Sequence, residues 1–203
     1  MVLYERIKKA DLRKIVADYA EIFYGWQLFD GVAFFREEGP IRQMVWFEAL
    51  RTGDYRPLCG ISASVMPTVR MLPQMLDVKH RQSTQKQHLI RKPGIEDAMK
   101  EQFLPNICKQ LDLTEVFSLC SASARETTND LAMLAIISGW LGRLDVARDY
   151  SSRALSCPSV LAPVPEWEAE IKAFCASLAQ AIETGSASEF LRSAVQKLRV
   201  SRK

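Results

Sequence analysis

The amino-acid sequence predicts an α+β protein, with an N-terminal helix on a four-stranded antiparallel meander followed by an all-helical C-terminal half. Apolar residues recur at three- and four-residue steps from Leu3 to Tyr24, as they do in an amphipathic helix, and Gly25 ends the pattern. Between Trp26 and Val65, short aromatic and β-branched runs alternate with turn formers. After Gly94, every segment has the periodicity and capping residues of a helix.

The turn formers Asp30-Gly31, Glu38-Gly39-Pro40 and Thr52-Gly53-Asp54 divide the meander into four strands. We expect these near Trp26 to Phe29, Val32 to Glu37, Ile41 to Ala49 and Tyr55 to Val65. Short connections make neighbouring strands antiparallel. Alternation along the third strand places Gln43, Val45 and Phe47 on one face and Met44, Trp46 and Glu48 on the other. One face is expected to rest on helices, with the other partly exposed.

The stretch from Pro67 to Pro93 contains three prolines and no regular period, which predicts a long, irregular crossing segment. A short additional strand around Gln87 to Arg91 is the alternative. From Val78 to Gly94 this stretch has five cations and two histidines but no acid. We call this part the basic segment.

Helices are then expected at Ile95 to Leu104, Asn106 to Leu111, Leu113 to Cys120, Leu131 to Trp140, Leu144 to Ser156, Glu166 to Thr184 and Ala187 to Arg199. Asp112 and Thr127 are typical N-cap residues for the third and fourth of these helices. The predicted organisation is a helix, sheet and basic segment over residues 1–93 and a helical bundle packed on the sheet over residues 94–203, together forming one unit.

Composition restricts the class of protein and its location. The 27 basic and 24 acidic residues give a net charge of +3, which is too balanced to indicate a polyanionic partner by itself. The five cysteines are widely spaced, without a C-x-x-C pair, and indicate buried thiols in a reducing compartment. No apolar run approaches the roughly 18 residues of a membrane span. A cytoplasmic protein without a membrane partner is expected.

Catalytic, cofactor and metal signatures are absent from the sequence. It contains no nucleophile elbow, no phosphate-binding loop and no dinucleotide fingerprint. His80 and His88 lack the nearby Cys, Asp or Glu residues that would complete a zinc site. Glu37 and Glu38 are neighbours on one strand, so they point to opposite faces and cannot act together as acid and base. We therefore assign no catalytic, cofactor-binding or metal-binding residue and expect no cofactor.

The predicted function is specific recognition of another protein, an acidic one, through the exposed face or edge of the meander and the basic segment. Aromatic residues are low-entropy anchors at interfaces, and cations favour an acidic partner. The predicted partner-binding residues are Lys79, His80, Arg81, Lys86, His88, Arg91, Lys92, Trp46 and Phe34. The first alternative is nucleic-acid binding through residues 79–92, and the second is a hydrolase whose active site is assembled from distant residues.

Three stretches resemble a family of uncharacterised bacterial proteins with a helix and an antiparallel meander. They are Gly25-Trp26-Gln27-Leu28-Phe29, Ile41-Arg42-Gln43-Met44-Val45-Trp46-Phe47 and Cys59-Gly60-Ile61-Ser62, followed by a helix that bears Phe103-Leu104-Pro105. The resemblance covers roughly residues 1–120. It implies an immunity or accessory binding protein linked to bacterial toxin systems, and it offers no catalytic residues to transfer.

A second, local resemblance concerns residues 131–156. Leu141-Gly142, Leu144, Ala147, Ala154 and Leu155 are similar to the small and apolar positions of one tetratricopeptide-like helical hairpin. The sequence departs from that pattern at Ser151, where an aromatic residue is usual, and a second hairpin around Gly185 does not keep the repeat spacing. We therefore expect a single repeat-like hairpin, with Trp140 and Leu141 on its inward side.

Overall fold

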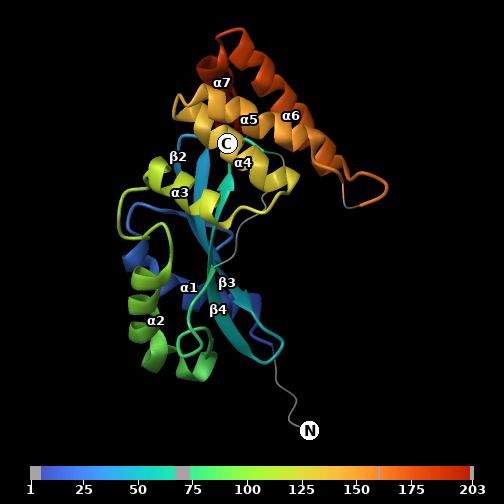
Figure 1. The fold of residues 1–203 in the computed structure, drawn as a ribbon. Coiled ribbons are helices and arrows are strands. Elements are labelled where there is room, and N and C mark those ends of the chain that lie inside the picture. The colour runs from blue at the N-terminus through green and yellow to red at the C-terminus, as the bar shows by residue number, and fades with distance from the viewer. Residues whose placement is uncertain (1–5, 67–73, 160, 202–203) are drawn as a thin grey trace. The chain divides into compact units, whose positions relative to one another are not determined.

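An antiparallel sheet forms in the N-terminal half of the chain, and helices follow it (Figure 1). The computed structural model describes residues 6–66, 74–159 and 161–201. This arrangement confirms the predicted α+β class. The expected helix start at residues 3–5 and residues 67–73 of the expected crossing segment lie outside the described residues. None of the described helices has the length and apolar character that a membrane span requires.

The four predicted strands are present, with ends within two residues of those expected. They are β1 (Gln27–Phe29), β2 (Ala33–Glu38), β3 (Ile41–Ala49) and β4 (Asp54–Ala63). Two short strands that the sequence did not reveal, β5 (Gln74–Met75) and β6 (Ser83–Thr84), both pair with β4. The order β1-β2-β3-β4-β5 makes β1 an edge strand, while β5 and β6 follow the opposite side of β4.

The N-terminal helix is shorter than its apolar periodicity indicated. α1 spans Lys9–Ala17, and a separate 3-10 turn, η1, spans Ala20–Phe23. The chain leaves the α-helix at Asp18 and Tyr19, whose side chains bond His88 and Tyr55 on distant elements. These tertiary contacts outweigh the local periodicity. Gly25 adopts a φ of 81°, which favours glycine and ends the turn.

The basic segment is more regular than predicted. A 3-10 turn, η2 (Gln85–Gln87), leads into α2 (His88–Gln102), so the predicted irregular region from residue 88 onward is helical and the alternative strand at 87–91 is also wrong. Pro93 lies inside α2, where it removes one backbone donor. Before α2, the Thr84 hydroxyl accepts from the N–H of Gln87 and caps η2. The helix predicted over Asn106 to Leu111 is absent, and this stretch is a loop.

The later helices agree closely with the sequence pattern. They are α3 (Leu113–Ser123), α4 (Thr128–Trp140), α5 (Leu144–Ser156), α6 (Glu166–Glu183) and α7 (Ala187–Ser201). The Asp112 carboxylate accepts from the N–H of Thr114, and the Thr127 hydroxyl accepts from the N–H of Asp130. Both predicted N-caps are therefore confirmed.

Contacts divide the chain into two units. The first contains residues 1–36, 43–61 and 71–111, and the second contains residues 37–42, 62–70 and 112–203. Residues 94–111 thus belong with the sheet and its helices. The tip of the β2–β3 hairpin, residues 37–42, belongs to the same unit as the later helices. The rest of β2 and β3 belongs to the first unit.

The core of the first unit lies between one face of the sheet and the helices α1 and α2. Val45, Phe47 and Tyr55 from the sheet pack with Ile15 and Val16 of α1, and α2 adds Ile95, Ala98 and Met99. The predicted alternation of β3 is confirmed, because Gln43, Val45 and Phe47 are buried while Met44, Trp46 and Glu48 are half-buried. The helices that cover this face within the first unit are α1 and α2.

In the second unit, α4 to α7 form two consecutive helical hairpins (Figure 1). Their turns have the same hydrogen bonds. Arg143 donates to the carbonyl of Ser138 and Ser186 donates to that of Ala181, each one residue after a glycine with positive φ. Ser151 is fully buried where the tetratricopeptide pattern has an aromatic residue, beside the equally buried Ala147 and Ala154 on α5. Small side chains thus let α4 and α5 approach closely.

Trp140 and Leu141 are half-buried and do not point into the centre of this bundle as expected. The Trp140 ring covers the tip of the β2–β3 hairpin. A Cβ atom added to Gly39 would lie 2.6 Å from that ring, and Gly39 has a φ of 54°. Gly39 therefore satisfies two requirements at once, a left-handed turn and room for the indole.

Candidate partner-binding surface

The predicted cations of the basic segment do not form one continuous charged loop. Lys79 and Lys86 are exposed, whereas Lys92 is half-buried and its Nζ lies 2.7 Å from Glu96 on the next turn of α2. The Arg91 guanidinium donates to the carbonyl of Lys79. Glu96, which follows the basic segment in α2, thus neutralises part of its charge. Arg81 is half-buried.

The two histidines have different roles. His80 is half-buried, with Nδ1 3.2 Å from Asp77. His88 is only 5% exposed, so it does not contribute to a contact surface as predicted. Its Nε2 lies 2.9 Å from the Asp18 carboxylate and its Nδ1 lies 2.8 Å from the Tyr55 hydroxyl.

His88 belongs to a chain of hydrogen bonds, which we call the tyrosine–histidine chain. It consists of the exposed Asp18 and the buried His88, Tyr55 and Tyr19. A carboxylate can only accept, so Nε2 of His88 donates to Asp18, while Nδ1 shares a hydrogen bond with the Tyr55 hydroxyl. The Tyr55 hydroxyl lies 2.7 Å from that of Tyr19. The chain joins the end of α1, strand β4 and the first residue of α2.

Burial determines the protonation of both tyrosines. It raises the pKa of Tyr55 to about 12 and raises the pKa of Tyr19 further, with the Tyr55 hydroxyl adding to the effect on Tyr19. Both hydroxyls therefore stay protonated and remain able to donate. The chain positions α2 rather than supplying a nucleophile.

The two aromatic residues predicted to anchor a partner are placed differently. Phe34 is buried in the core and stacks on Phe23, with ring centroids 4.4 Å apart, so it is unavailable to a partner. Trp46 is half-buried on the other face of the sheet. The β1 edge is separated from β6 and the basic segment by β2, β3 and β4 in the strand order. Of the two edges of the described sheet, the one along β5 and β6 is next to the basic segment.

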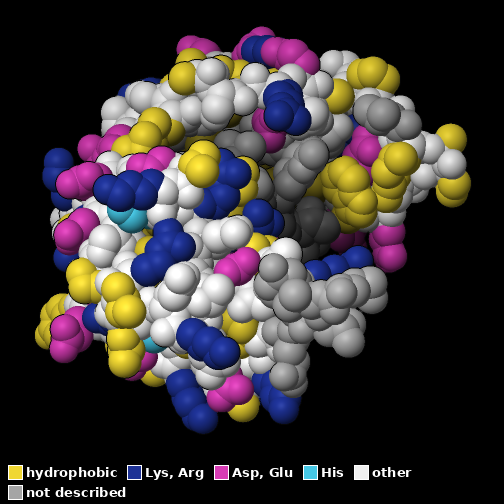
Figure 2. All heavy atoms as spheres, turned by 90° about the horizontal axis from the view of Figure 1, so that it is seen from below, with side chains coloured by type: hydrophobic (Ala, Val, Ile, Leu, Met, Phe, Trp, Pro, Cys, Tyr) yellow, Lys and Arg dark blue, Asp and Glu magenta, His cyan; other side chains and the backbone are white. Residues whose placement is uncertain are grey.

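Sequence reasoning missed three exposed apolar residues next to the cations. Leu89 and Ile90 on the first turn of α2 are 76% and 82% exposed, and Val78 is 81% exposed. We call Val78, Lys79, Lys86, Leu89 and Ile90 the α2 amino-terminal surface. The signal in the sequence was the apolar pair Leu89-Ile90 inside a charged stretch. Because the sequence did not show which side of the helix faces solvent, the pair could not be recognised as exposed. Figure 2 shows hydrophobic and cationic side chains lying next to one another when the molecule is viewed from below.

The backbone beneath this surface is firmly held. Besides the bond from Arg91 to Lys79, the His80 ring lies against Gly94, 3.4 Å from the position of an added Cβ. Gln102 near the end of α2 bonds both the backbone N–H and the carboxylate of Asp77, at 2.8 and 3.0 Å. These contacts hold the turn around Val78 against α2, so a partner would meet a preformed surface.

No group of three or more His, Cys, Asp or Glu side chains in the described part of the chain could hold a metal ion. Comparison with protein families, with characterised proteins and with solved structures found no match to this chain. The function is therefore inferred from the geometry of the surface.

Proposed function

We propose that this chain is a protein-binding module that recognises an acidic amphipathic segment of another protein through the α2 amino-terminal surface. The observation that carries the proposal is the exposure of Leu89 and Ile90, each more than three quarters exposed, together with the exposure of Lys79 and Lys86. Isolated exposed aliphatic residues are common, but adjacent ones on a fixed helix turn form a small apolar patch.

Energetic considerations agree with a partner of this kind. Complete burial of an aliphatic side chain stabilises an association by about 1.5–3 kcal/mol, so Leu89 and Ile90 can supply much of the affinity. Lys79 and Lys86 add long-range attraction and select against cationic partners. Because α2 is held in place by the tyrosine–histidine chain, little conformational entropy is lost on binding.

A neutralising role in a bacterial toxin system, or an adaptor role, is the form of recognition that we propose. The former is proposed from the resemblance inferred for the sequence of residues 1–120, to which the comparison with protein families adds no support. A toxin whose own binding face is acidic would then be the partner.

The test uses the surface itself to find and then measure the partner. A photo-crosslinking residue is placed at position 90 and, as a matched control, at position 28, where Leu28 is 55% exposed on the edge strand β1. We expect one protein crosslinked from position 90 and not from position 28. With that protein purified, the double variant L89S/I90S should bind at least about tenfold more weakly, a loss of about 1.4 kcal/mol, while L28S should bind like the parent. Equal affinities for the three proteins would refute the proposal.

Nucleic-acid binding is the alternative, since Lys79 and Lys86 remain exposed. The two functions predict different effects of salt and of these variants on the affinity. Affinity for a nucleic acid would fall steeply with salt concentration and with K79E/K86E, and would hardly change in L89S/I90S. The protein-binding proposal predicts the larger loss in L89S/I90S.

A further inference from the structure

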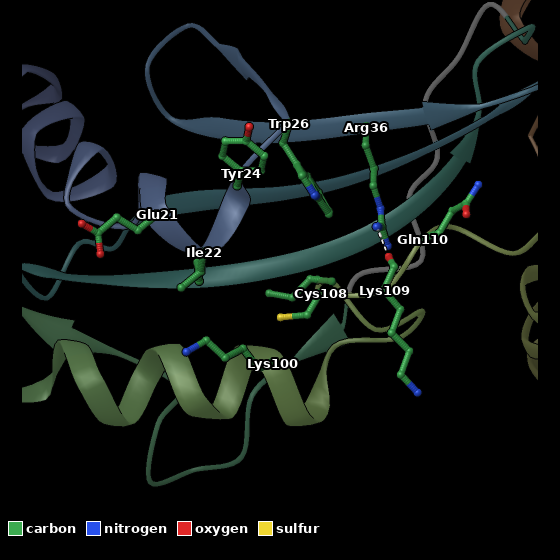
Figure 3. Close-up of a pocket in the computed structure, with 10 residues that line it drawn as sticks. Glu21, Ile22, Tyr24, Trp26, Arg36, Lys100, Cys108, Lys109 and Gln110 are labelled. Carbon is green, nitrogen blue, oxygen red and sulfur yellow. Dashed lines mark hydrogen bonds between the residues drawn. The ribbon is translucent and has the colours of Figure 1, made fainter.

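The first unit also contains a recess at the other end of α2 from the α2 amino-terminal surface. It has a volume of about 490 Å³, which lies in the range of small-molecule pockets. Figure 3 shows that its walls come from the chain around η1, from β2, from α2 and from the loop after it. Ile22, Trp26, Arg36, Lys100 and Cys108 contribute side chains. All these segments belong to the same unit.

One wall of the recess is rigid. The Arg36 guanidinium stacks over the Trp26 ring, with its central carbon 4.7 Å from the ring centroid. It donates to the carbonyls of Asn106 and Lys109 and to the side-chain oxygen of Gln43. Arg36 thus joins β2 to the loop and holds one face of the indole. These bonds fix the position of the guanidinium against the indole.

The remaining lining combines aromatic surface with positive charge. Tyr24 is 94% exposed at the rim, and Trp26 is half-buried below it. Lys100 extends from α2 on the side where Glu21 lies, as Figure 3 shows. Its nearest acid is Asp97 at 3.6 Å, and its side chain is 40% exposed, so this pairing is weak. The lining contains three cations, Arg36, Lys100 and Lys109, and one carboxylate, Glu21, while Asp97 outside the lining offsets part of the charge of Lys100.

We propose that this recess binds a nucleotide, with the base against Tyr24 and Trp26 and the phosphate beside Lys100. Aromatic side chains stack on any base, and an ammonium group is a strong donor to phosphate oxygens. Glu21 provides an acceptor for a ribose hydroxyl. An aliphatic anion would leave the aromatic rim unused, and a neutral ring would leave the Lys100 ammonium group with only its weak pairing to Asp97. This site is separate from the proposed protein-binding surface, so either can fail alone.

Binding is measured by calorimetry with the four nucleoside 5′-monophosphates, with adenosine, which lacks phosphate, and with ribose 5-phosphate, which lacks the base. We expect at least one monophosphate to bind with a dissociation constant below about 1 mM, and both truncated compounds to bind at least about tenfold more weakly. A short oligonucleotide in competition then distinguishes a free nucleotide from one within a strand.

The protein supplies its own second readout. Of the five cysteines, all in the described chain, Cys108 is exposed, Cys157 is half-buried and the other three are buried. In a C157S background, a bound nucleotide should slow alkylation of Cys108. The K100Q variant should lose at least about tenfold in affinity, because a charged hydrogen bond is lost, while K86Q at the other end of α2 should not. The proposal is refuted if no monophosphate binds below about 1 mM, if Cys108 is not protected, or if K100Q and K86Q bind alike.

Discussion

The two units are stabilised in different ways. In the first unit, the core contains polar side chains that must meet one another, such as Tyr19, Tyr55, His88 and Gln43. In the second unit, the middle of α4 from Leu131 to Ile137 is buried on all sides and is entirely apolar. The first core depends on a few specific hydrogen bonds between distant elements. The second depends on close packing of aliphatic and small side chains.

The largest effect is expected from a cavity in the second unit. Ile136 is fully buried in α4, so I136A should lower the free energy of unfolding by about 2–5 kcal/mol, as measured by urea denaturation. Leu144 on α5 is 37% exposed, and L144A is the control, with a loss below about 1 kcal/mol. Equal losses would show that α4 is not the centre of this core.

A smaller effect is expected when the first unit loses one hydroxyl. Y55F removes the group between His88 and Tyr19 and leaves buried partners without a hydrogen bond, at a cost of about 1–3 kcal/mol. The same substitution at the exposed Tyr24 should change the unfolding free energy by less than about 0.5 kcal/mol. If Y55F and Y24F unfold at the same urea concentration, the tyrosine–histidine chain does not stabilise the unit.

Packing of Trp140 on the hairpin tip predicts coupling between two residues of the second unit. G39A places a methyl group against the Trp140 ring and strains a left-handed backbone, but in a W140A background only the backbone strain remains. The cost of G39A should therefore fall by at least about 0.5 kcal/mol when Trp140 is absent.

The control for this double-mutant cycle of Gly39 and Trp140 is Gly142. It also has a positive φ, but a Cβ atom added to it would meet nothing within 4 Å. The cost of G142A should be the same with and without Trp140. If the cost of G39A is equally independent of Trp140, the indole does not cover Gly39.

The smallest effect concerns charge at the surface of the first unit. Bonds from Lys9 and then from Arg13 hold the pKa of Asp30 below its ordinary value of 3.8. Because the folded-state pKa is lowered, the stabilisation is fully present above 3.8 and is lost as the pH falls through the folded-state value. An NMR titration of the Asp30 carboxyl should show this lowered midpoint.

The matched variants for this titration are K9M and K14M. The first removes the 2.7 Å ion pair between Lys9 and Asp30 and should raise the midpoint, while the second removes only the pairing of Lys14 with Asp11. A midpoint that responds equally to both variants would mean that general surface charge, not the specific pair, lowers the pKa.

The sequence predicted the parts of the fold in which local signals and tertiary contacts agree. The Asp30-Gly31 and Gly53 turns separate the strands, and Asp112 and Thr127 cap their helices, because these residues act on the backbone next to them. The strand pattern of β3 was also readable, since its two faces differ in burial. The predicted class and most element bounds follow from these short-range rules.

The site was much less predictable. Of the predicted partner-binding residues, Phe34 and His88 are buried and Lys92 is paired, whereas Leu89 and Ile90 were not selected. The sequence shows which side chains are charged or apolar but not which of them meet. The rotation of α2 about its axis determines which side chains face outward. The sequence did not reveal this helix, because Pro93 and the many charged residues interrupt its apolar periodicity.

Sequence alone determined the strands β1 to β4, the helices α3 to α7 and the turns between them. Only the tertiary structure decided that His88 is enclosed by Tyr55 and Asp18, that Leu89 and Ile90 face outward, and that Arg36 holds one wall of a recess with Trp26. The physical reason is the range of the interactions. Caps and turns act within a few residues. In contrast, His88 lies 33 residues from Tyr55 and 70 residues from Asp18 in the sequence. Arg36 and Asn106 are also 70 residues apart.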